Sequence, residues 1–264
     1  MNTHAMDRNH QGKPWWSEDG LDNDGVVASG HDVVSGHTIA KWTENWWQWA
    51  LQAPNGPFNS DSQSIGQGRM TFIAGEFNDP NLASATIHAS AYTPILFPMI
   101  NAFDTEGLSN PKLETIPNFV NDGRGSYADE ARFVTNLFQR SIYDAHATLT
   151  MDAGNGHTKT IFDVHLQGSE AADAGVQSGI FALGAPVTGS FIAQLLDGIT
   201  LDPSIKDLPF TRSTGDWIEI DGLKPGTYTL AFGGSGHAVV DPVSGTPIAQ
   251  EGWGASVKDT LIIK

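Results

Sequence analysis

The sequence predicts a mainly β fold, a β-sandwich of jelly-roll-like type with two helices packed outside it and an extended N-terminal arm. Short segments of alternating apolar and polar residues, typical of half-buried strands, recur from residue 70 onwards. Only two segments, 38–52 and 126–140, are predicted as helices from apolar residues at helical spacing. Glycine accounts for 29 of 264 residues, as expected where many turns join strands. We therefore expect an arm over 1–37 and a single sandwich domain over 38–264.

The predicted arm is rich in Asn, Asp, His and Gly and contains few apolar residues. Trp15 and Trp16 are exceptions, because each indole can bury about 200 Å² and is costly to leave in water. We expect these two side chains to dock on their own domain or on a neighbouring copy. A disordered terminus is the alternative interpretation.

The first helix is predicted by a stripe of large apolar residues. Thr38 is a suitable N-cap, and Pro54 ends the segment. The stripe repeats at i, i+3, i+7 and i+10 and consists of Ile39, Trp42, Trp46 and Trp49. This spacing favours a helix packed on a sheet. An exposed aromatic platform for sugar rings is the alternative.

The second helix is predicted by its start signal. Ser126 and Asp129 have the spacing of a capping box, with Asp in place of the usual Glu. Phe133 and Leu137 then continue an apolar stripe towards Arg140. The rest of the chain predicts strands at 70–74, 85–89, 95–97, 146–151, 159–166, 190–196, 217–220, 227–232 and 258–263. Pro225-Gly226 predicts a type II turn in a hairpin that joins two of these strands.

The charge balance excludes several classes of partner. The chain has 14 basic and 30 acidic residues, a net charge of −16, and no cluster of Lys or Arg. Binding to nucleic acid or to an anionic membrane surface is therefore not expected. No apolar run reaches the length of a spanning helix, and the first residues lack the apolar stretch of a signal peptide. The absence of cysteine excludes disulfides and thiolate chemistry.

Acidic residues in the arm indicate a candidate calcium site. Asp19, Asp22 and Asp24 are closely spaced, and hard carboxylate oxygens are the ligands that Ca²⁺ prefers. The spacing does not match an EF-hand, because the twelfth loop position would be His31. Asp122 is a weaker candidate of the same kind. A solvated acidic loop without an ion is the alternative.

Histidines on neighbouring strands are a second candidate for metal binding. His146 and His165 lie on two predicted strands, and His157 lies in the glycine-rich turn between them. This arrangement can bring two imidazoles together in a zinc or copper site. Because no established histidine ligand spacing is present, scattered core or surface histidines are the favoured interpretation.

Catalytic patterns are weak. Asp216, Glu219 and Asp221 are near one another in sequence, and paired carboxylates can hydrolyse glycosidic bonds. Their alternation with Trp217 and Ile218 instead favours the solvent-facing side of a half-buried strand. We expect no catalytic residues.

Four segments, in this order, resemble a poorly characterised family of secreted bacterial proteins. They are Trp42-x-x-x-Trp46-Trp47-x-Trp49-Ala50, Gly66-Gln67-Gly68-x-x-x-Phe72-Ile73-Ala74-Gly75, Pro94-Ile95-Leu96-Phe97-Pro98-x-x-Asn101 and Leu223-Lys224-Pro225-Gly226-x-Tyr228-x-Leu230-x-Phe232-Gly233-Gly234. The resemblance implies no activity and carries over no catalytic residue. It does imply cysteines near residues 61–64 and 101–103, which this chain lacks.

These observations predict a non-catalytic extracellular protein that assembles with copies of itself into an oligomer or filament, stabilised by calcium. The acidic surplus needs counterions if copies are to pack closely. Trp15, Trp16 and Trp253 are the expected assembly or ligand contacts. One alternative is a carbohydrate-binding module that stacks polysaccharide on these residues or on Trp217. The other is a hydrolase acting on polysaccharide.

Overall fold

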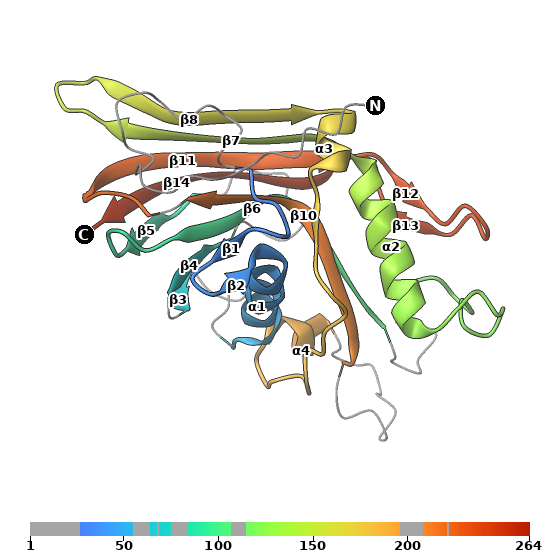
Figure 1. Ribbon diagram of the computed structural model, residues 1–264. Helices are drawn as coiled ribbons and strands as arrows, with labels where there is room; N and C mark the ends of the chain where they lie inside the picture. Colours follow the sequence, from blue (N-terminus) through green and yellow to red (C-terminus); the bar gives the residue numbers. More distant parts are fainter. Residues whose placement is uncertain are drawn as a thin grey trace.

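Two five-stranded sheets form the body of the protein, as the computed structural model shows (Figure 1). The structure describes residues 27–54, 64–67, 69–74, 84–106, 115–195, 208–220 and 222–264. The first sheet has the order β3 (Ser64–Gln67), β4 (Met70–Ile73), β6 (Ile95–Glu106), β10 (Phe210–Ile220), β9 (Val176–Gln177). The second has the order β5 (Thr86–Ala89), β14 (Trp253–Ile263), β11 (Gly226–Gly236), β7 (Ile142–Asp152), β8 (Thr158–Gln167). The fold is therefore mainly β, as predicted.

Smaller elements lie around these sheets. Two short antiparallel pairs are formed by β1 (Val33–Val34) with β2 (His37–Thr38) and by β12 (Val239–Val240) with β13 (Pro247–Ala249). The helices of the described residues are α1 (Ile39–Gln52), α2 (Tyr127–Ser141), α3 (Ser169–Asp173) and α4 (Phe191–Leu195). None of these helices is long and apolar enough to cross a membrane.

Side chains from both sheets meet in one buried cluster. Phe97 of β6 and Phe232 of β11 have ring centroids 4.9 Å apart, and both rings are almost completely buried. Ile218 of β10 and Leu230 of β11 belong to the same cluster. Burial of this apolar surface between the sheets supplies the main driving force for their association.

Helix α1 covers the other face of the first sheet. Its N-cap is Thr38, whose hydroxyl accepts a hydrogen bond from the Lys41 N–H at 3.2 Å, as predicted. The tryptophan stripe is buried, and Trp46 contacts Trp217 of β10 edge-on, with ring centroids 5.4 Å apart. The packing interpretation of this helix is confirmed. An exposed sugar platform on it is excluded, because these indoles have no access to a ligand.

Helix α2 begins at the predicted capping box. The Ser126 hydroxyl accepts from the Asp129 N–H, and the Asp129 carboxylate accepts from the Ser126 N–H at 2.9 Å. The helix packs on β6 and β10 at the end of the first sheet that extends beyond the second (Figure 1). It buries mainly polar and small side chains there, in contrast to α1.

Part of the predicted arm is described, and that part is attached to the first sheet. Ala28 N–H donates to the Trp217 carbonyl at 2.9 Å, and Ala28 is buried. Residues 33–38 then form the β1–β2 pair that leads into α1. Trp15, Trp16, Asp19, Asp22 and Asp24 lie outside the described residues.

Two local predictions are wrong. The segment around Pro225-Gly226 is not a hairpin, because β10 belongs to the first sheet and β11 to the second. The chain crosses between the sheets here, and the positive φ lies at Gly222 (95°) rather than at Gly226. Within the predicted strand 190–196, residues 191–195 form α4, with the Ser190 hydroxyl accepting from the Ala193 N–H at 3.2 Å.

The interpretation of β10 as a strand with one solvent-facing side is also wrong. Asp216, Trp217 and Ile218 are all buried. The reason is that both faces of β10 are covered. Helix α1 covers one face, while α2 and the second sheet cover different parts of the other face. A charged residue in alternation with apolar ones therefore does not mark a wet face here.

Candidate metal centre

The hairpin of β7 and β8 brings chemically competent side chains together on the exposed face of the second sheet. Asp144 is paired with Gln167, and His146 with His165, in the antiparallel register. Side chains of opposite residues, and of residues i and i+2, share a face. The other face of β7 carries core residues such as Ala145, so these four side chains point outward.

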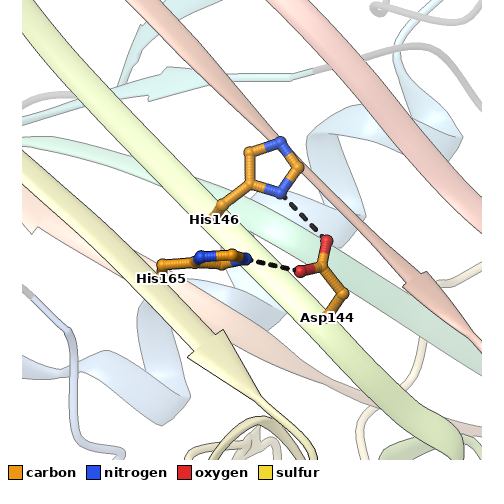
Figure 2. Close-up of side chains that lie close together, drawn as sticks. All are labelled: Asp144, His146 and His165. Atoms are coloured by element: carbon orange, nitrogen blue, oxygen red, sulfur yellow. Dashed lines mark hydrogen bonds and ion pairs between the residues drawn. The ribbon is translucent and has the colours of Figure 1, made fainter.

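Asp144 bridges the two histidines (Figure 2). Its Oδ2 lies 3.1 Å from His146 Nδ1, and its Oδ1 lies 2.7 Å from His165 Nε2. One donor atom from each of the three residues lies within 4.8 Å of the others. We call Asp144, His146 and His165 the outer triad. Among the residues that the structure describes, this is the place where three potential metal ligands come together.

The outer triad is open to solvent. The side chains of His146 and His165 are 44% and 54% exposed, and that of Asp144 is 24% exposed. The residues of β11 that lie opposite His146 and Asp144 are Gly233 and Ser235, and both have small side chains. The imidazoles therefore extend further from the sheet than the neighbouring side chains of β11.

Hydrogen bonding at His165 Nε2 depends on the orientation of the Gln167 amide. This nitrogen must carry a proton to donate to Asp144, yet it must offer a lone pair to accept from the Gln167 Nε2 amide at 3.3 Å. One nitrogen cannot do both. Turning the Gln167 amide so that its oxygen faces His165 removes the conflict, whereas a metal ion would take the Nε2 lone pair and leave no acceptor there for the amide N–H.

A cavity of about 1010 Å³ lies between β8 of the second sheet and segments that are attached to the first sheet. Residues 27–31, β8 and the segment 170–177 contribute to its lining. His31, Glu170 and Asp173 bring titratable groups to it, and His165 is the member of the outer triad that it includes. Asp144 and His146 do not line it, so the triad stands at the rim of the cavity rather than inside it.

A second group of carboxyls lies beneath α2 and is buried. Asp104 and Glu106 follow one another on the same face of β6, and Glu130 approaches from α2. Thr115 donates its hydroxyl to Asp104 Oδ1 at 2.6 Å. Burial raises the pKa of Asp104 and of Glu106, and for Glu106 the neighbouring charges of Asp104 and Glu130 raise it further. These two carboxyls therefore tend to keep a proton between them.

Asp216 is the other buried acid in this region. Its Oδ1 accepts from the Gln139 amide at 3.1 Å, and the Thr214 hydroxyl donates to the same amide's oxygen at 2.6 Å. Burial raises the pKa of Asp216 to about 7. Glu219 lies on the face of β10 that it shares with Trp217, beneath α1. The two carboxyls do not converge on a common space, so they do not form the pair that glycoside hydrolysis needs.

The pKa of Asp241 is shifted in the opposite direction, below its ordinary value. Arg124 forms two hydrogen bonds with its carboxylate, at 2.7 and 2.8 Å, and holds the pKa of Asp241 well below its usual range. The Arg124 guanidinium also stacks on the ring of Phe119 at 4.5 Å. This ion pair connects the segment before α2 to the turn between β12 and β13 and stabilises their contact.

Asp122, a predicted calcium ligand, and Trp253, a predicted assembly contact, occupy different settings. Asp122 is exposed in the turn before α2, and no metal-ligand group among the described residues includes it. Trp253 is half-buried against the core, edge-on to Phe138 at 5.1 Å, and its Nε1 donates to the His237 carbonyl at 3.1 Å. Its indole is thus largely engaged within the protein.

Sequence reasoning placed His146 and His165 on neighbouring strands and left a zinc or copper site as the less favoured interpretation. It missed Asp144, because the predicted strand began at residue 146 whereas β7 begins at Ile142. Asp144 lies two residues before His146, so a strand that extends to residue 144 places both side chains on one face, and this spacing is the signal that points to Asp144. His157 lies in that turn and takes no part in the outer triad.

Comparison of the chain with protein-family models, with curated proteins and with solved structures gives no match.

Proposed function

We propose that this protein is a non-catalytic β protein that binds one divalent transition-metal ion at the outer triad. The observation that carries the proposal is the convergence of two imidazoles and a carboxylate, with donor atoms within 4.8 Å of one another. Imidazole nitrogen with carboxylate oxygen suits Zn²⁺, Cu²⁺ and Ni²⁺ better than Ca²⁺, which prefers oxygen alone. His146 would bind through Nδ1 and His165 through Nε2, the atoms that face Asp144.

The setting of the triad supports binding rather than catalysis. Catalytic metals work in shaped cavities that exclude water and position a substrate. The outer triad instead lies on an exposed sheet face beside small residues, and of its members only His165 lines the neighbouring cavity. The buried acids beneath α2 are enclosed by protein and do not approach it.

The test uses untagged protein, since a histidine tag would itself bind the metal. We expect isothermal titration of the chelator-treated protein with Zn²⁺ to give one site per chain. His146→Ala and His165→Ala each remove one ligand and are expected to weaken binding by at least tenfold. His157→Ala, which removes an exposed histidine from the turn of the same hairpin, is the matched control and leaves the affinity unchanged. Equal affinities in all four proteins would overturn the proposal.

We further propose that the two sheets constitute a β-sandwich of jelly-roll-like type with an N-terminal arm. The shared apolar cluster between the sheets supports the sandwich. Calcium binding at Asp19, Asp22, Asp24 and Asp122, self-assembly and an extracellular location also remain proposals, which the net charge of −16 supports. Light scattering with and without a chelator tests the assembly, since a monomer under both conditions would contradict it.

A further inference from the structure

We propose that the metal ion at the outer triad joins two copies of this chain, with Asp163 of the second copy as the fourth ligand. This inference rests on the proposed metal binding and adds the partner that completes the site. It also gives the expected self-association a specific surface, the outward face of the β7–β8 hairpin.

The coordination of the ion supports a partner. Zn²⁺ bound to protein is almost always four-coordinate when it serves structure. The outer triad supplies three donors, all on one side of the ion, because all three side chains rise from the same sheet face. The fourth position therefore points away from the sheet. The described residues add no further ligand to this group, and a donor from a second copy can approach the ion from that side.

The surface around the triad allows a second copy to approach. Ser235, Gly233 and Ala231 face Asp144, His146 and Thr148, in that order, across the β7–β11 ladder, and none of them extends far from the sheet. Strand β8 is the outermost strand of its sheet, so the hairpin stands at one side of the molecule (Figure 1). The β11 side chains beside the triad therefore leave room for a second copy, and a long side chain of this face, Lys258, lies on β14 opposite Ala231.

Asp163 is the donor that a two-fold arrangement favours. It lies two residues before His165 on the same face of β8, and it is exposed. It is outside the group whose donor atoms lie within 4.8 Å, so it is not placed to bind its own chain's ion. In an isologous dimer each copy offers the same patch to the other. A carboxylate next to the triad then reaches the opposite triad, and two equivalent metal sites form.

Charge explains why the ion is needed. Each chain has a net charge of −16, so two copies repel one another. Asp144 and Asp163 both lie on the contact face, where burial of unpaired carboxylates would be costly. Two divalent ions at this contact neutralise those carboxylates in both copies. Without the ions, the same face disfavours association.

The variant Asp163→Asn separates this inference from the proposed function. Asparagine keeps an oxygen that can accept the hydrogen bond from the Thr148 hydroxyl, now 2.8 Å from Asp163 Oδ1, so the hairpin is expected to fold unchanged. Asp152→Asn is the matched control. It removes the same charge from the same hairpin and keeps an oxygen for the Gly154 N–H.

Sedimentation velocity and zinc titration of these proteins give the test. The wild-type chain and Asp152→Asn are expected to be monomers with chelator and dimers with one Zn²⁺ per chain. Asp163→Asn is expected to bind one Zn²⁺ per chain and to dimerise at least tenfold more weakly. Zinc-bound wild-type protein that stays monomeric overturns the inference while leaving the metal site intact, as does a dimer of unchanged strength in Asp163→Asn. Absence of zinc binding would overturn the proposed function itself.

Discussion

Helices α1 and α2 rest on the same sheet in two different ways. Helix α1 buries four tryptophans against β4, β6 and β10, and its contact with the sheet is almost wholly apolar. Helix α2 buries Glu130, Thr135 and Gln139 against β6 and β10, where acids of the strands are also buried. Its own apolar side chains Phe133 and Val134 belong to a separate small cluster with Phe119.

The two contacts differ in how their contribution to stability depends on pH. Apolar burial is nearly independent of pH and rises with the area removed from water. Buried carboxyls make the stability of their surroundings depend on protonation. We expect α1 to be the pH-independent anchor of the first sheet and α2 to be the region whose stability changes with pH.

The strongest test of this comparison is the replacement of Trp46 by alanine. Trp46 is 1% exposed, meets three other tryptophans edge-on, and donates its Nε1 hydrogen to the Ile73 carbonyl at 2.9 Å. Trp46→Ala is expected to lower the free energy of unfolding by about 3–5 kcal/mol, as for other large-to-small core changes. Urea denaturation measures it, with Val33→Ala, at a site 67% exposed, as the control. A loss below about 1 kcal/mol would show that α1 is not the anchor.

The second test is the pH dependence of stability. Because burial raises the pKa of Asp216 to about 7, the folded protein holds this proton at pH values where the unfolded chain, with the ordinary aspartate pKa of 3.8, has released it. Stability from this group is full below about pH 4 and is lost as pH rises towards 7, by roughly 2–4 kcal/mol.

Asp216→Asn is expected to flatten the decline of unfolding free energy between pH 4 and pH 7. Asp259, whose pKa burial raises to about 6, lies on β14 and away from α2, so Asp259→Asn is the comparison variant. Chemical denaturation at a series of pH values measures the slopes. An unchanged slope in Asp216→Asn would show that protonation of Asp216 does not cause the pH dependence of the unfolding free energy.

The third test concerns the N-caps, because the two helices begin in the same way. Both have a hydroxyl N-cap, Thr38 for α1 and Ser126 for α2. Thr38→Ala and Ser126→Ala are each expected to cost about 1 kcal/mol in chemical denaturation. Similar losses would show that the helices differ in their contacts with the sheet and not in their caps. A loss much larger at one cap would contradict this.

The smallest expected effect is at the outer triad, which serves neither helix. His146→Ala in metal-free protein is expected to change the unfolding free energy by less than about 0.5 kcal/mol, because its side chain is 44% exposed. Added Zn²⁺ is expected to raise the melting temperature of the wild-type protein and not that of the variant. A large loss of stability without metal would mean that the triad is a structural cluster.

The sequence predicted the elements whose signals are local. The tryptophan stripe and the Ser126–Asp129 capping box depend on residues within one or two turns, and both helices lie where they were expected. The hairpin at Pro225-Gly226 failed because strand pairing is decided by distant segments, and β10 pairs with β6 rather than with β11. The short apolar run 190–196 failed because such runs suit a strand and a helix equally.

The candidate site was predictable in part. The positions of His146 and His165 on adjacent strands followed from alternation and from the turn between them. Their exact opposition and the inclusion of Asp144 depend on the register, which shifts between Leu149 and Thr150. A shift of this kind changes which residues share a face, and single-sequence patterns do not reveal it.

The position of β14 within its sheet has a consequence for biosynthesis. This strand lies between β5 and β11, and its contact with the segment before β5 joins residues 174 positions apart, Ala85 and Asp259. Neither neighbour has its full set of backbone partners until residues 253–263 have left the ribosome. The nascent chain therefore exposes unpaired strand edges through most of its synthesis, which makes early chaperone contact an advantage for its yield.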